Sequence, residues 1–472
     1  MKPSPSLRAL LTRRALLGRS AGGLGALALA SLLQPDLRAS GGLRGMPHFA
    51  PRAKRVIFLF MAGGPSHVDL FDPKPQLKRR EGQPIPPELL KNHQQFALIR
   101  GTPSLRGSPY AFPKCGQSGA VISELLPHLG KVADDLTIIR SMHTDTNVHD
   151  PAVNFMNCGT QLGDRPTLGA WLSYGLGSEN QDLPAYIVLT SGASDGQPLL
   201  QSFWGQGFLD SRHAGVPFRN SGDPVLHLAN PAGLSPADRR RELDLMQWMN
   251  RRQSDALGDP AIASRIASYE LAFRMQASVP ALADLQDEPE HILKLYGADP
   301  AKPSFARNCL LARRLVERGV RFVQLYDRGW DSHTDIDREH RRQCLASDQP
   351  AAALLTDLKQ RGLLEDTLVI WGGEFGRTPV AQVAGTTWGR DHHPHAFSMW
   401  LAGGGLKPGL TYGSTDEFGY NAAESPVHVH DLHATILHQL GLDHRQLTFR
   451  TQGRDFRLTD VSGTVVRDIL AG

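Results

Sequence analysis

The side chains best suited to chemistry lie between residues 367 and 400. A short apolar run, residues 368–371, ends in two glycines and is followed by the carboxylate of Glu374 and the guanidinium of Arg377. A histidine-rich loop then adds His392, His393 and His395. Imidazole and carboxylate groups can hold a transition metal or transfer protons, and a guanidinium can bind an anion. The alternative is that Glu374 and Arg377 form a surface ion pair and that the histidines are solvated.

Three other apolar runs lead into polar residues of the same kind. Residues 56–61 precede His67 and Asp69, residues 136–140 precede His149, and residues 320–326 precede Asp331 and His333. In open α/β sheets, ligand-binding and catalytic residues lie in the loops that follow the carboxyl ends of the strands. We therefore expect these side chains to contribute to one site. That site either binds a divalent metal or performs acid–base catalysis without one.

The elements that must position these residues follow from the apolar runs and the segments between them. The runs are short and apolar, as expected for strands covered on both faces, and they alternate with segments of helical spacing. We predict an α/β fold with a mostly parallel central sheet and helices on both faces. The expected strands are residues 56–61, 136–140, 186–189, 320–326, 368–371 and 397–402. The expected helices are residues 123–129, 152–157, 166–174, 305–318, 351–360 and 431–440, with a helical insertion at about 230–300.

Two local patterns place further histidines. Asp150 before Pro151 predicts an N-cap followed by a proline in the first helical turn. His149 would then lie at a helix N-terminus, which is a favourable position for an oxyanion. Alternatively, His149 only caps this helix or packs against its neighbours. The histidines around residues 428–433 precede or begin an amphipathic helix, and we expect them at the surface.

The N-terminus predicts export. Arg13 and Arg14 form a twin-arginine pattern before an apolar run at residues 21–33. That run is shorter than the roughly 20 residues of a membrane span. We interpret residues 1–45 as a twin-arginine signal peptide and linker, cleaved between Ala39 and Pro51, with the twin-arginine translocase as partner. The expected location is periplasmic or secreted; the alternative is an uncleaved membrane anchor.

Charge and cysteine content exclude some classes of protein. The chain has a net charge of +4, but residues 1–45 contain seven basic residues and one acidic residue, so the remainder carries −2. This balance gives no support for nucleic-acid binding. The four cysteines are widely spaced and form no C-x-x-C metal motif. The spacing is compatible with one or two disulfides and equally with free buried thiols.

Four motifs in combination resemble a known family. They are MAGGPSHVDLFDPKP, RSMHTDTNVHDP, GWDSHT and GGEFGRTP. The chain is similar over about residues 50–460 to the twin-arginine-secreted bacterial family called domain of unknown function 1501, within the alkaline phosphatase and sulfatase-like superfamily. The resemblance implies a mostly parallel central sheet and a metal-assisted hydrolase site for phosphate or sulfate esters.

The superfamily pattern is altered at several positions. Gly63 and Gly64 stand where sulfatases have paired aspartates, and His149 stands where the nucleophile is expected. No C-x-P-x-R motif occurs, which excludes a formylglycine mechanism. His393 matches the alkaline phosphatase histidine. His333 keeps the register of a D-x-x-x-H metal pair, although Gly329 replaces its aspartate.

The sequence and the resemblance together predict an exported hydrolase-like protein acting on a phosphate or sulfate ester, either a small molecule or a polysaccharide. His149 is expected to act as nucleophile or general base, and Arg377 to hold the anion. One divalent metal ion, zinc, manganese, iron or calcium, is expected on some of Asp69, His333, Glu374 and His393. Further candidates are His67, Asp331, His392 and His395. The alternative is a non-catalytic exported protein that binds an anion or glycan through a degenerate site.

Overall fold

The computed structural model describes residues 42–90, 96–99, 103–192, 197–220, 222–226, 228–231, 233–257, 260–382 and 387–472. These residues belong to one compact unit, Gly42–Gly472. The predicted twin-arginine pattern at Arg13 and Arg14 lies outside the described residues. Among the helices of the described part, none is both long enough and apolar enough to cross a membrane.

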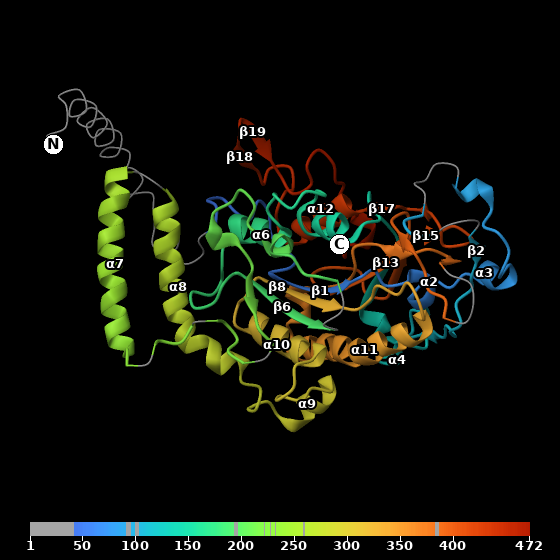
Figure 1. Ribbon diagram of the computed structural model, residues 1–472, viewed down its shortest axis with the longest axis horizontal. Coiled ribbons are helices and arrows are strands. Elements are labelled where there is room, and N and C mark those ends of the chain that lie inside the picture. Colours follow the sequence, from blue (N-terminus) through green and yellow to red (C-terminus); the bar gives the residue numbers. More distant parts are fainter. Residues whose placement is uncertain are drawn as a thin grey trace. The chain divides into compact units, whose positions relative to one another are not determined.

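A nine-stranded sheet forms the centre of this unit (Figure 1). Its main path is β14 (Leu410–Tyr412), β5 (Leu136–His143), β13 (Phe397–Ala402), β9 (Thr367–Gly372), β1 (Arg55–Ala62), β8 (Phe322–Arg328), β6 (Tyr186–Gly192) and β7 (Val216–Phe218). The short strand β17 (Val427–His428) also pairs with β5. Pairing is parallel along this sheet except where β13 meets β5 and β9. The predicted α/β class with a mostly parallel sheet is confirmed.

Helices cover both faces of the sheet, and β1 shows why. Its alternate residues Ile57, Leu59 and Met61 pack into one hydrophobic cluster, while Val56, Phe58 and Phe60 pack into another. Successive side chains of a strand point to opposite faces, so an unbroken apolar run requires a cover on each side. One cover comprises α4 (Pro127–Lys131), α10 (Phe305–Glu317) and α11 (Ile336–Gln360); the other comprises α5 (His149–Cys158), α6 (Leu168–Leu176) and α12 (Val429–Gln439).

The segment 230–300 is mainly helical. It contains α7 (Pro236–Leu257), α8 (Pro260–Ala283) and α9 (Glu290–Tyr296). The last turns of α8 join the core through Met275, Val279 and Leu282. By contrast, Trp248 and its neighbours Leu245 and Met249 on α7 are exposed.

Several predicted boundaries were wrong. The N-cap of α5 is Val148, so Asp150 lies inside the first turn. Helix α11 begins fifteen residues earlier than predicted and passes through Pro350. Its buried face in that part includes His340, Gln343 and Ser347, and these polar residues hide the apolar period. Helix α4 is shorter than predicted because it starts at Pro127, whose fixed φ suits a first turn.

The prediction that the histidines near α12 lie at the surface was wrong for two of them. His430 and His433 are 7% and 1% exposed. Each ring uses Nε2 to reach a carbonyl at the C-terminal end of α5, at Gly159 and Met156, both at 2.8 Å. Because the last carbonyls of a helix lack partners within it, buried N–H donors there satisfy them.

Candidate metal centre

Four elements meet at one edge of the sheet and carry the functional side chains. Glu374 follows the end of β9, and Asp331 and His333 follow the end of β8. His149 begins α5, after the end of β5. His392 lies in β12 (His392–His393), just before β13. Since β13 is antiparallel to its neighbours, its beginning lies at the edge where the other strands end.

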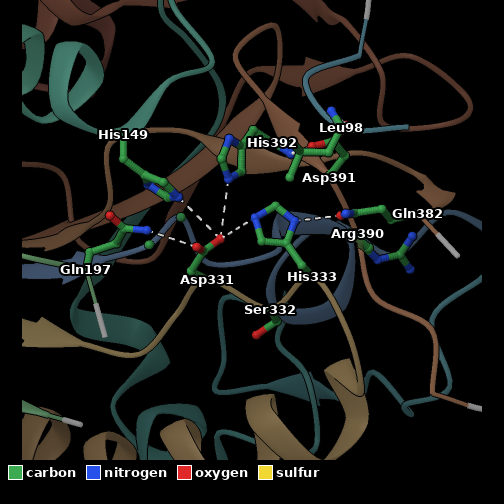
Figure 2. Close-up of polar contacts among 12 residues, drawn as sticks. Leu98, His149, Gln197, Asp331, Ser332, His333, Gln382, Arg390, Asp391 and His392 are labelled. Atoms are coloured by element: carbon green, nitrogen blue, oxygen red, sulfur yellow. Dashed lines mark hydrogen bonds and ion pairs between the residues drawn. The ribbon is translucent and has the colours of Figure 1, made fainter. Parts of the chain in front are cut away.

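Within the described residues, one group of side chains has the geometry to hold a metal ion. It consists of His149, Asp331, His333 and His392, whose ligand atoms all lie within 4.8 Å of one another. The three Nε2 atoms surround Asp331 Oδ1, at 3.3 Å for His149, 2.8 Å for His333 and 3.3 Å for His392 (Figure 2). Three nitrogens and one carboxylate oxygen therefore converge on a small volume.

The hydrogen bonds at Nδ1 of the three rings determine whether each Nε2 carries a proton or a lone pair. Each Nδ1 lies beside an oxygen: Glu374 Oε1 at 2.6 Å for His149, Gln382 Oε1 at 2.5 Å for His333, and the Asn147 carbonyl at 2.7 Å for His392. A neutral imidazole that donates from Nδ1 presents a lone pair at Nε2. Three lone pairs facing a carboxylate oxygen repel one another unless a proton or a cation lies among them. Imidazoles fixed in this way by an outer oxygen are characteristic of metal ligands.

Glu374 lies behind His149 and not inside the cluster. It is fully buried, and the backbone N–H of Gly63 donates to its two oxygens at 3.0 and 3.2 Å. Gly63 has φ +120°, and a Cβ at this position would collide with the backbone of Trp330 and Asp331. The glycine thus allows β1 to pass close to the loop that carries Asp331, and Glu374 orients His149.

Arg377 is buried and makes all its contacts within the protein. Its Nε donates to the Gly64 carbonyl at 2.9 Å, and its Nη1 to the Arg390 carbonyl at 3.0 Å. Its Nη2 donates to the Gly63 carbonyl and, at 2.5 Å, to Asp331 Oδ1. In this structure Arg377 therefore orients Asp331 and does not face an open anion site.

Charge coupling within the cluster is strong. Burial lowers the pKa of His149, but hydrogen bonds and the charges of Asp331 and Glu374 outweigh burial and raise that pKa to about 9. Burial raises the pKa of Asp331, yet the three histidines and Arg377 hold it far below its usual range. Burial lowers the pKa of His392 to about 4. Without a cation, a proton on His149 balances the charge; a bound divalent ion would replace that proton.

The cluster opens to solvent on one side. The side chains of Asp331 and His333 are each 22% exposed, so part of the cluster is accessible to solvent. Asp331 lies in a cleft of about 410 Å³, which we call the Asp331 cleft and which Gly329 and Gln197 also line. Gln197 Nε2 donates to Asp331 Oδ2 at 2.9 Å. Structural metal sites are usually closed by protein, whereas an open side is typical of catalytic ones.

Four of the other predicted residues lie outside the cluster. Asp69 forms a buried ion pair with Arg390, with oxygen–nitrogen distances of 2.7 and 3.2 Å. His67 Nε2 lies 2.8 Å from the Gly419 carbonyl, and His393 Nε2 lies 2.5 Å from the Tyr420 carbonyl. His395 packs against His393, with ring centroids 5.5 Å apart. None of the four is part of the group of converging ligand atoms among the described residues.

Sequence reasoning missed the groups that hold the ligands. Gln197 and Gln382 act through neutral side chains and Asn147 through its backbone carbonyl, and each is far in sequence from its partner. No residue type could mark Asn147, because its backbone carbonyl is the group that holds His392. Asp331 and His392, expected only as further candidates, are both members of the cluster.

The sequence matches the family model described as "Protein of unknown function (DUF1501)" over residues 53–470. No curated protein gives a significant match. Similar solved structures include the PsFucS1 sulfatase from Pseudoalteromonas sp., at 12% identity and TM-score 0.35, covering 93% of this chain and 72% of that one.

Two further similar structures are an alkaline phosphatase and a phosphonate monoester hydrolase. A magnesium-bound mutant of TAB5 alkaline phosphatase has 11% identity and TM-score 0.31, covering 75% of this chain and 92% of that one. The phosphonate monoester hydrolase SpPMH from Silicibacter pomeroyi has 13% identity and TM-score 0.31, covering 74% and 72%. Because these TM-scores are low, the similarity carries no argument about function, and only the side chains of this chain bear on it.

Proposed function

The chain belongs to the DUF1501 family, and from its site we propose that it is a metal-dependent hydrolase of phosphate or sulfate esters. One observation carries the proposal: three imidazoles, each fixed at Nδ1 by an oxygen, direct Nε2 at the partly exposed carboxylate of Asp331. The ester class is the one that the resemblance to the alkaline phosphatase and sulfatase-like superfamily implies.

The residues that would hold the metal are His149, Asp331, His333 and His392. Three imidazole nitrogens and one carboxylate oxygen suit zinc, manganese or iron, whereas calcium prefers oxygen ligands. A bound divalent ion supplies a polarising positive charge and lowers the pKa of a bound water.

The protein's own residues prepare this site. Glu374 fixes the His149 ring through Nδ1 and so directs Nε2 inward. Arg377 donates to one oxygen of Asp331 and Gln197 to the other, which keeps the carboxylate from rotating. The role expected for Arg377 therefore changes from anion clamp to positioning residue, because its donors are directed at backbone carbonyls and Asp331.

Water is the proposed nucleophile. Among the described residues, no hydroxyl or thiol hydrogen-bonds to the four ligand side chains. With Nε2 of His149 assigned to the metal, this ring is not available to attack phosphorus or sulfur. The proposal is therefore a single displacement by water, without a covalent intermediate on the protein.

The self-contained hydrogen bonding of Arg377 favours a second candidate, a metal-containing protein that binds an anion without turnover. In that case the metal would be bound at the same residues and no ester would be hydrolysed. Turnover separates the two candidates.

The test is metal content and activity measured on the same preparations. We expect about one transition metal per chain after reconstitution, and loss of that metal in His333→Ala and His392→Ala. His291→Ala, on the exposed face of α9, is the matched control. Each protein is assayed on aryl phosphates, phosphodiesters and aryl sulfates. A wild type that holds no metal would overturn the proposal; stoichiometric metal without turnover on any ester would leave the binding protein as the function.

A further inference from the structure

A pair of arginines on α11 lines the Asp331 cleft and has no part in the chemistry proposed above. Arg338 and Arg342 line it together with Thr334 and Glu339. The cleft volume of about 410 Å³ falls in the range of roughly 300–1,000 Å³ typical of small-molecule sites. A ligand in this cleft would contact both the arginines and Asp331, the residue of the cluster that lines it.

Both arginines pair with the carboxylate of Glu339. Arg338 donates to Glu339 Oε1 from Nε and Nη2, at 3.2 and 2.9 Å. Arg342 donates to Glu339 Oε2 from the corresponding nitrogens, at 3.1 and 2.6 Å. No hydrogen bond between described residues engages the Nη1 of either guanidinium. Arg338 Nε also lies 3.2 Å from Asp335 Oδ2, so two carboxylates balance the charge of the two guanidiniums. Each guanidinium keeps one donor group, Nη1, for a ligand in the cleft.

The neighbouring Arg341 shows that this arrangement is not a general property of the helix. Its guanidinium pairs with Asp337 at 3.0 Å and lies over the Tyr110 ring at 5.1 Å. It is not among the residues that line the cleft. Residues four apart on a helix share a face, so Arg338 and Arg342 project together and Arg341 projects elsewhere.

We propose that Arg338 and Arg342 recognise a second anionic group of the substrate, so that the site takes esters carrying at least two negatively charged groups. This rests on the proposed function only in calling the ligand a substrate. One anionic group would lie at the cluster, and the other would lie between the two guanidiniums. A guanidinium fork matches the geometry of phosphate and sulfate oxygens and remains charged at all working pH values.

Glu339 determines the strength of this recognition. Its carboxylate occupies the Nε and Nη2 edges of both arginines and repels an incoming anion. Glu339→Gln removes that negative charge while retaining one acceptor oxygen. We therefore expect this variant to bind a doubly anionic ligand more tightly than the wild type does.

The test is calorimetric binding to the metal-free full-length chain, which has a readout independent of turnover. Two ligand pairs are compared: a hexose bisphosphate with its monophosphate, and a disulfated disaccharide with its monosulfated form. We expect the wild type to prefer the doubly anionic member of at least one pair by about tenfold or more, as for hydrogen bonds to charged groups. The pair that shows the preference identifies phosphate or sulfate.

The Arg338→Gln/Arg342→Gln double variant should lose the preference, and Arg341→Gln should keep it. Because both arginines are at least half exposed, at 73% and 50%, the double variant should keep the wild-type melting temperature. Absence of the preference in wild type, or its persistence in the double variant, overturns the inference. A binding preference here, with no ester turnover by the metal-loaded protein, would leave the inference standing and the hydrolase proposal refuted. Turnover by the metal-loaded protein that ignores the second charge would do the reverse.

Discussion

At the scale of single residues, His149 is the most informative side chain. It lies between two carboxylates, Glu374 and Asp331, and this position gives it two compatible states. In one state a proton on the ring compensates both negative charges; in the other a metal ion takes the proton's place at Nε2. The same geometry explains the raised pKa, about 9, and the expected competition between protons and metal.

Glu374→Gln should weaken metal binding without unfolding the protein. The neutral amide no longer supplies the negative charge that makes His149 a better ligand, although it can still accept from Gly63. Loss of such an outer partner typically lowers metal affinity or activity by about 10–100-fold. Metal titration of the variant measures this effect. Glu365→Gln, an exposed glutamate before β9, is the matched control, and equal affinities in all three proteins would contradict the role given to Glu374.

Asp69→Asn should cost stability and leave metal content unchanged. Asp69 and Arg390 are 1% exposed or less, and removing one partner of such a buried pair typically costs about 3–5 kcal/mol. The comparison is Asp337→Asn, which removes a half-exposed pair with Arg341 and should cost less than about 1 kcal/mol. Denaturant unfolding gives both values. If Asp69→Asn lost the metal at unchanged stability, Asp69 would be a ligand after all.

At the scale of elements, helices pack closely against the sheet. On helix α6, Gly169 faces Tyr186 of β6 and Phe322 of β8. A Cβ on Gly169 would lie 2.6 Å from the Tyr186 ring and 2.8 Å from the Phe322 ring. These aromatic rings are buried and cannot move aside.

Gly169→Ala should therefore destabilise the protein although alanine favours helix. The gain in helix propensity is about 1 kcal/mol, and overpacking a core typically costs about 1–3 kcal/mol. Gly175→Ala in the same helix meets only the flexible end of Leu447, at 3.1 Å, and should cost less. Thermal or denaturant unfolding of both variants tests the packing. A stabilised Gly169→Ala protein would show that α6 does not lie this close to the sheet.

The contact between α12 and α5 predicts a pH dependence. Burial, together with neighbouring His430 and His428, lowers the pKa of His433 to about 3, below the usual 6.5 of histidine. Between these values the unfolded chain binds the proton and the folded protein does not, so stability falls as pH falls from 6.5 toward 3. His433→Gln, which can still donate to the Met156 carbonyl, should reduce this loss. His291→Gln is the control and should not reduce the loss. Identical profiles of stability against pH for wild type and His433→Gln would contradict the prediction.

At the scale of the whole molecule, we propose that the chain is exported through the twin-arginine pathway. The proposal rests on Arg13 and Arg14 followed by a short apolar run. Replacing both by lysine keeps the charge and removes the pattern. We expect the variant to accumulate in the cytoplasm, as measured by cell fractionation, while a lysine replacement at Arg8 leaves export unchanged. Normal export of the double variant would show that the N-terminus was misinterpreted.

Much of the architecture could be predicted from the sequence because the central strands are buried on both faces. Residues 56–61 and 368–371 are continuous apolar runs, and they occupy β1 and β9. Helix α11 was harder, because polar side chains such as His340 and Gln343 are buried along it and interrupt the apolar period. The local sequence pattern predicts an element reliably where its buried residues are apolar. It fails where buried residues are polar and hydrogen-bonded within the fold.

The sequence by itself determined the strands, the mostly parallel α/β class and the fact that ionisable residues follow the strand ends. Only the tertiary structure decided which of these residues meet. Asp69 and Asp331 both follow buried strands, yet Asp69 pairs with Arg390 while Asp331 lies among three imidazoles. The physical reason is that strand order and the reversed direction of β13 set which loops become neighbours, and the partners that fix each ring come from distant segments. Convergence of side chains is a property of that packing, and no local pattern encodes it.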